Sequence, residues 1–367
     1  MFQLDEPYVG KEEIKYLTDA INSGWISSLG PYVEKFEKMF ASYIGVKYAV
    51  SCASGTSALS LLLPTLQIKE GDEVILQSMT FTADAFAMKQ NGARIIFADC
   101  SKDRFTICPE DVKKKITKKT KIISPTHLYG RPAEMDELKK ICDNNNIYLI
   151  EDCCQATGAK YKNKMVGSIG HFNFHSFHNK LIASGEGGMI TTNDKDLALR
   201  FEKLKNPPSV NRPDERDGFS EISMNHRLSN LHAAVGLAQL ERLESNIEKK
   251  IKMANLYNDL LNNVEGINII KADEWSRTVY WRYTIHLDKR INIKKFKDRA
   301  LNLGIMTRET YLPMHLHPFF KEYNHLSLPN SEKLSNEGLD IPSSFNLSEK
   351  DIIFIAENLK KIAKDLL

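Results

Sequence analysis

Short apolar runs alternate with amphipathic stretches from about residue 45 to residue 195, and this alternation constrains the fold more than any other feature. Runs that are apolar throughout are typical of strands buried on both faces, and the stretches between them have helical spacing. The predicted strands are Lys47–Ser51, Glu73–Leu76, Arg94–Ala98, Lys121–Ser124, Ile147–Glu151, Phe172–Phe174 and Met189–Thr192. The predicted helices are Lys11–Ser23, Tyr32–Tyr43, Ser57–Leu66, Thr82–Gln90, Pro109–Ile116 and Ala133–Asn144. Together these elements predict an α/β fold in which helices sandwich a mostly parallel sheet.

The pattern changes after residue 200. Asn206–Asp217 is rich in proline and charge, which is typical of a loop or linker. We expect a large domain with N-terminal helices at residues 1–245 and a smaller C-terminal α+β domain at residues 246–367. The remaining predicted elements are one or two helices from Leu228 to about Asn262, a strand at Trp281–Leu287, and helices at Lys294–Leu303 and Glu349–Leu366.

Composition excludes several classes of protein. Lys and Arg number 50 and Asp and Glu 47, so the net charge is +3, and with the basic residues interleaved with acids no nucleic-acid partner is expected. The six cysteines show no C-x-x-C spacing, so we expect neither a metal site nor a disulfide framework. The uncharged segment Tyr48–Ile68 contains Gly55, Pro64 and many hydroxyl side chains, which argues against a membrane span. Acids at Asp5 and Glu6 argue against a signal peptide, and a cytoplasmic protein is expected.

The triplet Ser54-Gly55-Thr56 follows a predicted strand and opens a predicted helix. Backbone N–H groups at a helix start can bind a phosphate, and glycine allows its close approach. On this motif alone an ordinary N-cap is the commoner explanation. No lysine follows as in a Walker loop and no G-x-G-x-x-G follows the first strand, so nucleotide triphosphate and nicotinamide cofactors are disfavoured.

Asp152 comes one residue after a buried apolar run. Open α/β sheets place their ligands at the carboxyl ends of strands, where an acid can hold a cationic ring nitrogen. Glu151 is the weaker candidate, because alternation along the strand points it away. A cap or turn carboxylate is the plain alternative for Asp152.

Lys180 lies in the aromatic and glycine-rich segment Phe177–Gly188, which contains no other lysine or arginine. Such surroundings disfavour the charged amine, which suits imine chemistry, although an isolated lysine is usually a surface residue. A phosphate cradle, an acid at a strand end and a desolvated lysine on one sheet are the parts that hold pyridoxal 5'-phosphate. The combination therefore predicts this cofactor.

Ordered motifs extend this pattern along almost the whole chain. They are Ser23–Ile26, Gly30-Pro31, Tyr48–Val50, Ser54–Thr56, Gly71–Val74, Thr80-Phe81, His127–Gly130, Glu151-Asp152, Gln155, Lys180, Gly185–Gly188, Asn225–Asn230, Gly236–Glu241 and Pro313–His315. In these motifs the chain resembles the nucleotide-sugar aminotransferases of the DegT/DnrJ/StrS type, which belong to the fold type I class of pyridoxal-phosphate enzymes. The resemblance implies an aspartate-aminotransferase-like large domain and a sugar aminotransferase activity.

The resemblance also implies roles for residues around the cofactor ring. Lys180 matches the lysine that joins the cofactor covalently and moves the substrate proton, and Asp152 matches the partner of the pyridine nitrogen. Gln155 matches the residue beside the 3-hydroxyl group, and Phe81 matches the aromatic that stacks on the ring.

A second group of matches concerns the cofactor phosphate. Gly55 and Thr56, which follow Ser54, match phosphate-binding residues, and Ser176 resembles a serine that also reaches the phosphate. Asn225 matches an asparagine that the other subunit of such enzymes contributes. The resemblance therefore implies a homodimer with shared active sites.

The family suggests a keto-deoxy sugar of a nucleotide sugar as substrate, L-glutamate as amino donor, and a role in surface polysaccharide such as O-antigen. Ser27, Arg212, Arg308 and His315 are candidate substrate contacts, because arginine pairs well with diphosphate oxygens. Trp25–Ser28 and Asn179-Lys180 resemble perosamine-synthase-like members, which act on a GDP sugar.

Two departures from the family pattern leave alternatives open. The segment from Ser176 to Lys180 is one residue shorter than usual, and Ser223-Met224 replaces a Gly-Tyr pair. Relatives that carry histidine in place of the lysine remove a sugar hydroxyl, so a keto-sugar dehydratase is one alternative. His178, two residues before Lys180, is the histidine that bears on this alternative. A non-catalytic ligand-binding regulator is another, and it would be expected to lack Lys180 or Asp152.

Overall fold

The computed structural model describes residues 1–206 and 222–367. Its centre is a seven-stranded sheet in which β9 runs antiparallel to both of its neighbours, while the other pairs are parallel. In spatial order the strands are β1 (Tyr48–Cys52), β9 (Gly188–Thr192), β8 (Phe172–Ser176), β5 (Tyr148–Asp152), β4 (Thr120–Ser124), β2 (Glu73–Gln77) and β3 (Arg94–Ala98). Each predicted strand is present within two residues of its expected ends, so the predicted fold class is confirmed.

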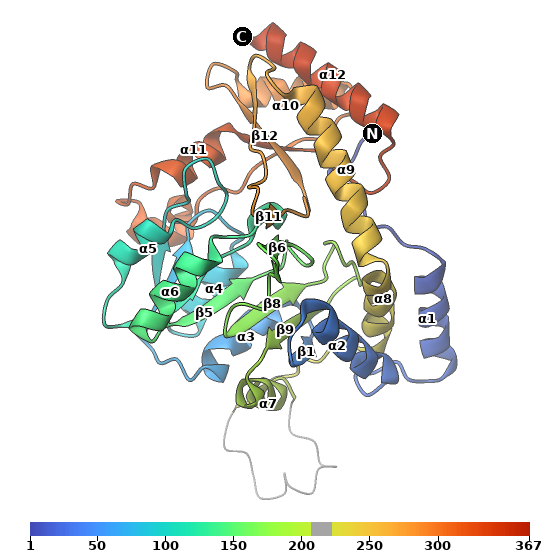
Figure 1. Ribbon diagram of the computed structural model, residues 1–367, viewed down its shortest axis with the longest axis vertical. Helices are drawn as coiled ribbons and strands as arrows, with labels where there is room; N and C mark the ends of the chain where they lie inside the picture. Colours follow the sequence, from blue (N-terminus) through green and yellow to red (C-terminus); the bar gives the residue numbers. More distant parts are fainter. Residues whose placement is uncertain (207–221) are drawn as a thin grey trace, which may run out of the picture.

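Helices cover both faces of this sheet (Figure 1). Neighbouring strand residues point to opposite sides, so Ile122 and Ile150 belong to one core and Ile123 and Leu149 to another. In the first core, three helices pack against the sheet: α3 (Gly55–Thr65), α4 (Ala83–Gln90) and α7 (Lys195–Leu204). The opposite face carries α2 (Pro31–Ile44), α5 (Pro109–Lys115), α6 (Met135–Asn145) and α8 (Asn230–Glu241), with α1 (Lys11–Asn22) beside α8.

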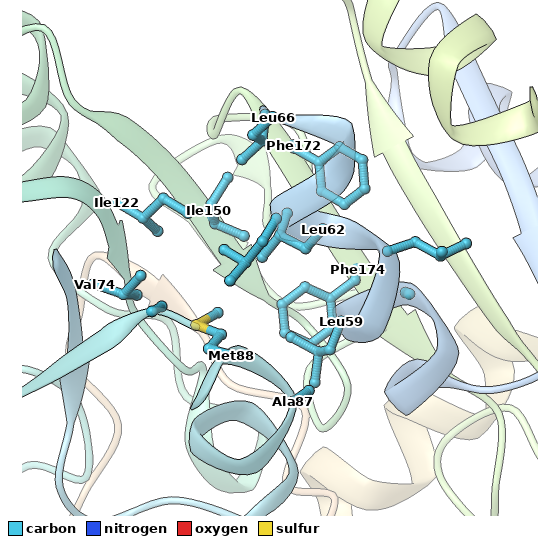
Figure 2. Packing of buried hydrophobic residues seen from close by; sticks show 14 of the residues in the cluster. Leu59, Leu62, Leu66, Val74, Ala87, Met88, Ile122, Ile150, Phe172 and Phe174 are labelled. Carbon is cyan, nitrogen blue, oxygen red and sulfur yellow. The ribbon is translucent and has the colours of Figure 1, made fainter. Parts of the chain in front are cut away.

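Helix α3 anchors the first core. Leu59 and Leu62 project from it toward Phe174 of β8, with Met88 of α4 close by (Figure 2). Because α3 starts directly after β1, this packing fixes where the Ser54–Thr56 turn lies above the sheet edge.

The C-terminal part forms a second, antiparallel sheet. Its strands in order are β10 (Ile267–Ile269), β12 (Tyr283–Leu287), β14 (Gly338–Ile341) and β13 (Arg308–Glu309). The helices packed on it are α9 (Leu243–Leu261), α10 (Ile293–Asn302) and α12 (Glu349–Leu366). The predicted domain boundary between residues 245 and 246 falls at the start of α9, and it stays a prediction.

Several short elements were not predicted. They are α7, α11 (Pro329–Glu337), β10, β13, β14, and a small sheet of β6 (Lys160–Tyr161), β7 (Lys164–Met165) and β11 (Ser276–Arg277). A strand of two residues carries no recognisable period, which explains why β6, β7, β11 and β13 were missed. Among the described residues, no helix has both the length and the apolar composition that crossing a membrane requires.

Replacing Leu62 by alanine should lower the free energy of unfolding by about 2–5 kcal/mol, because this fully buried side chain leaves a cavity between α3 and the sheet. Urea denaturation followed by circular dichroism measures the change. Leu199→Ala is the matched control, since Leu199 is 57% exposed on α7 and its loss should cost about 0.5 kcal/mol or less. Equal losses in the two variants would contradict the packing described for α3.

Candidate active site

A cavity of about 550 Å³ opens at the carboxyl ends of the parallel strands, between the large sheet and the C-terminal part. Parallel sheets commonly hold their ligands at this edge. Ten of the residues singled out in the sequence line it: Ser54, Gly55, Thr56, Phe81, Asp152, Gln155, Ser176, His178, Lys180 and Arg308.

The turn from β1 into α3 forms one wall. Ser54 is the N-cap of α3, and its hydroxyl accepts a hydrogen bond from Ser57 N at 3.0 Å. The N-cap interpretation therefore holds for this serine. A Cβ atom on Gly55 would lie 3.0 Å from Ser176 Cβ and 3.1 Å from Cys154 Sγ, so only glycine fits there without a shift. The unpaired N–H groups of the first helical turn thus meet the hydroxyl of Ser176 in one place, an arrangement suited to a phosphate.

Two buried carboxyl groups form the floor of the cavity. Asp152 is the last residue of β5 and accepts a hydrogen bond from Cys154 N at 2.9 Å. Asp84 is the second residue of α4 and lies beside Asp152. Burial raises the pKa of Asp84 well above its ordinary value, and the charge of Asp152 and a hydrogen bond to it act in the same direction. Asp84 Oδ2 has no hydrogen-bond partner among the described residues. The pair therefore carries about one negative charge, available to one cationic group.

Glu151 points away from the cavity, as strand alternation predicts. Its two oxygens accept four hydrogen bonds, from His127 Nε2 and from the backbone N–H groups of Gly167, Ile169 and Gly170. His127 Nδ1 accepts from Ala133 N, which fixes the proton on Nε2. His127, Glu151 and Cys153 lie close enough to ligate a metal ion, but these hydrogen bonds already satisfy the carboxylate.

Lys180 enters the cavity from the loop that follows β8. Burial lowers the pKa of its amine to about 8, and the positive charge of Arg282 adds to this effect. Nearby Asp152 and Asp5 oppose the shift. The amine can thus be either protonated or free near neutral pH, as a group that both attacks a carbonyl and carries a proton requires.

Arginines line the opposite wall. Arg282 and Arg308 both pair with the fully buried carboxylate of Asp340, at 3.1 Å and 3.3 Å. The Arg308 side chain is 43% exposed and lies over the ring of Tyr311. One carboxylate shared by two guanidinium groups leaves a net positive charge on this wall, so it favours an anionic ligand.

Phe81 and Gln155 complete the cavity. The ring of Phe81 is 53% exposed and meets Tyr311 edge-on, with 6.2 Å between ring centroids, so its face is free to stack on a planar ligand. Gln155 is held at both ends, because Oε1 accepts from Tyr129 N at 2.9 Å and Nε2 donates to the Tyr311 hydroxyl at 3.3 Å.

The structure does not bring every candidate to the cavity. Ser27 is exposed on the turn between α1 and α2, where its carbonyl accepts from Asn230 N, and Asn225 is exposed and accepts from Arg227 Nε. His315 does not line the cavity either: its side chain is fully buried and forms hydrogen bonds with Ser78 and Glu332, so its substrate contact stays a prediction. Arg212 lies outside the described residues.

Among the charged and aromatic residues that line the cavity, sequence reasoning missed four: Asp84, Trp281, Arg282 and Tyr311. Asp84 gave a usable signal, because it is the one charged residue between Gln77 and Met88 in the sequence. Trp281 and Arg282 were assigned to a strand, but β12 begins at Tyr283, and both side chains line the cavity.

Comparison of the sequence with models of protein families identifies the class of protein to which this cavity belongs. The model of the "DegT/DnrJ/EryC1/StrS aminotransferase family" matches residues 7–360 of the chain. The chain belongs to this family. It is therefore an aminotransferase of a pyridoxal-phosphate-dependent family, and the resemblance found in the motifs is confirmed.

Individual relatives agree over nearly the full length. The GDP-perosamine synthase of Escherichia coli O157:H7 is 36% identical over 362 residues, 98% of both chains. The dTDP-3-amino-3,6-dideoxy-alpha-D-galactopyranose transaminase of Aneurinibacillus thermoaerophilus is 32% identical over 354 residues, covering 96% of this chain and 95% of the relative. The putative sugar aminotransferase Spr1654 from Streptococcus pneumoniae, in its PMP form, shares the fold with a TM-score of 0.93, 22% identity and complete coverage of both chains.

Replacing Asp84 by asparagine should make the cofactor-free protein increasingly more stable than the unaltered chain as pH rises above about 4. The buried acid keeps its proton in the folded state but loses it in the unfolded state, so stability falls as pH rises toward the raised pKa. Asparagine does not titrate, and the stability difference should grow by up to about 1.4 kcal/mol per pH unit. Urea denaturation at several pH values measures it, and a difference that stays constant would mean that Asp84 is ionised.

Proposed function

We propose that this aminotransferase moves the amino group of L-glutamate to a keto-deoxy sugar carried by a nucleoside diphosphate, for the synthesis of surface polysaccharide. The observation that carries the proposal is the joint placement of Lys180 and Asp152 in one cavity that also has an anion-favouring wall. The names of the two curated relatives, a GDP-sugar synthase and a dTDP-sugar transaminase, support a nucleotide-sugar substrate.

The described residues fit pyridoxal 5'-phosphate. The carboxylate of Asp152 is available to a cationic ring nitrogen, Asp84 beside it has one buried oxygen without a partner among the described residues, and Gly55 leaves room for a phosphate at the start of α3. Phe81 offers an exposed ring face, and Gln155 lies near it in a fixed orientation. These residues, with Ser54, Thr56 and Ser176, would hold the cofactor.

When bound, this cofactor withdraws electrons from the substrate carbon that loses its proton. Asp152 would keep a proton on the ring nitrogen, and Asp84, whose pKa is raised by burial, would stay neutral beside it. Lys180, with its pKa near 8, takes the proton from one carbon and returns it to another. Arg308 and Arg282 hold the anionic part of the substrate against the opposite wall.

Lys180→Ala should abolish aminotransfer while the protein stays folded, because no other lysine among the described residues lines the cavity. The assay offers UDP-, GDP- and dTDP-linked keto sugars with glutamate and detects by mass spectrometry the exchange of a carbonyl oxygen for an amino group. Borohydride treatment of the unaltered enzyme should label the peptide that contains Lys180. A product without nitrogen would favour the dehydratase alternative, and turnover in the variant would refute the role of Lys180.

We also propose that the enzyme is a homodimer in which Asn225 serves the cavity of the other subunit. Asn225 is exposed and does not line the cavity of its own chain. Its proposed contact with the phosphate therefore requires a second copy.

Mixing Lys180→Ala and Asn225→Ala chains tests this arrangement. If the two residues come from different subunits, each mixed dimer contains one intact site, and an equimolar mixture should recover about a quarter of the unaltered activity. Each variant alone should be inactive or strongly impaired. A mixture no more active than the average of its parents would contradict a shared site.

A further inference from the structure

Two cations lie close to the indole ring of Trp281. Lys180 Nζ is 3.6 Å from the ring centroid, and the guanidinium carbon of Arg282 is 4.4 Å from it. A cation over an indole face is attracted by the negative face of the ring, most strongly where water is excluded. Trp281 is 3% exposed, so the contact with Lys180 is formed in a largely dry environment.

Hydrogen bonds from distant parts of the chain fix the orientation of this ring. Trp281 Nε1 donates to Asp5 Oδ2 at 3.0 Å and to the carbonyl of Asn179 at 3.2 Å. Asp5 Oδ1 in turn lies 3.9 Å from Nζ of the buried Lys250, which also donates to the Trp281 carbonyl at 3.1 Å. The N-terminal segment, the loop before Lys180 and helix α9 thus all hold the indole in place.

Three charged groups also act on the Lys180 amine. Asp152 at the end of β5 and Asp5 from the N-terminal segment favour its charged form, while burial and Arg282 disfavour it. Neither a carboxylate nor a hydroxyl group among the described residues forms a hydrogen bond or an ion pair with Nζ. The indole face is therefore the contact that determines where the amine lies.

We propose that the Trp281 indole is the docking face for the Lys180 amine whenever that amine is not covalently engaged, and that Asp5 orients the indole. The inference rests on the proposed role of Lys180. It makes Trp281 and Asp5 positioning residues: the ring returns the freed amine to one place, from which it can carry the substrate proton. An amine without this face would sample many rotamers, and correct alignment would be lost.

The contact itself is tested in the full chain without cofactor. In a Trp25→Phe, Trp275→Phe background, Trp281 is the remaining tryptophan, and its fluorescence should change as pH passes through about 8, where Lys180 titrates. Burial also lowers the pKa of Lys250 to about 8, so the decisive comparison is with Lys180→Met, in which Lys250 is unchanged. Lys180→Met should lose most of this change, and an unaltered fluorescence profile would overturn the docking contact.

The positioning role is tested in the enzyme loaded with cofactor. Trp281→Leu should slow the half-reaction with glutamate roughly tenfold or more, with KM changed much less, while borohydride still labels Lys180. Trp281→Phe keeps an aromatic face and should lose less, and Asp5→Asn should give a smaller decrease of the same kind. Trp275→Leu is the matched control, because the guanidinium group of Arg104 lies over the Trp275 ring but Trp275 does not line the cavity.

The outcomes separate this inference from the proposed function. A Trp281→Leu half-reaction within twofold of the Trp275→Leu rate would overturn the positioning role, even if Lys180 is labelled and aminotransfer is normal. Failure of borohydride to label Lys180 in the unaltered enzyme would instead refute the proposed function. A loss that appears only as a lower thermal midpoint, with normal kcat in the folded fraction, would also overturn the inference.

Discussion

The burial of the seven-stranded sheet on both faces is the constraint on which the rest of the structure depends. Its strands contain too little polar surface to face water, so the helices that connect the parallel strands must cover each face. Parallel strands then end together, which places Asp152 of β5 and the loops after β1, β2 and β8 around one cavity. The chemistry of the site follows from this convergence, since residues far apart in sequence meet where the backbone leaves the sheet.

The large sheet could be predicted from the sequence because its signal is local. Runs such as Arg94–Ala98 carry their own β preference and burial, and the predicted range of that strand agrees with the structure at both ends. The choice of Asp152 over Glu151 could also be made locally, because alternate residues of a strand face opposite sides. The structure places Glu151 in a closed network of hydrogen bonds and Asp152 in the cavity.

The parts that sequence reasoning missed depend on contacts between distant residues. Asp5 and Trp281 are 276 positions apart, and no local pattern indicates that a carboxylate near the N-terminus orients a ring beside Lys180. His315 is a further case, because the sequence could not show that its side chain would form hydrogen bonds with Ser78 and Glu332, which lie 237 and 17 positions away. Asp84 lies between these cases: its position in an otherwise uncharged segment was visible, but its meeting with Asp152 required the fold.

The shared carboxylate of Asp340 has a consequence for how the family can diversify. Two guanidinium groups depend on one buried acid, so loss of Asp340 alone would leave them repelling each other, and loss of one arginine would change the charge of the whole wall. Related enzymes that bind a differently charged substrate are therefore expected to differ at Arg282, Arg308 and Asp340 together. Coordinated variation at these positions among homologous enzymes would record such shifts in substrate preference.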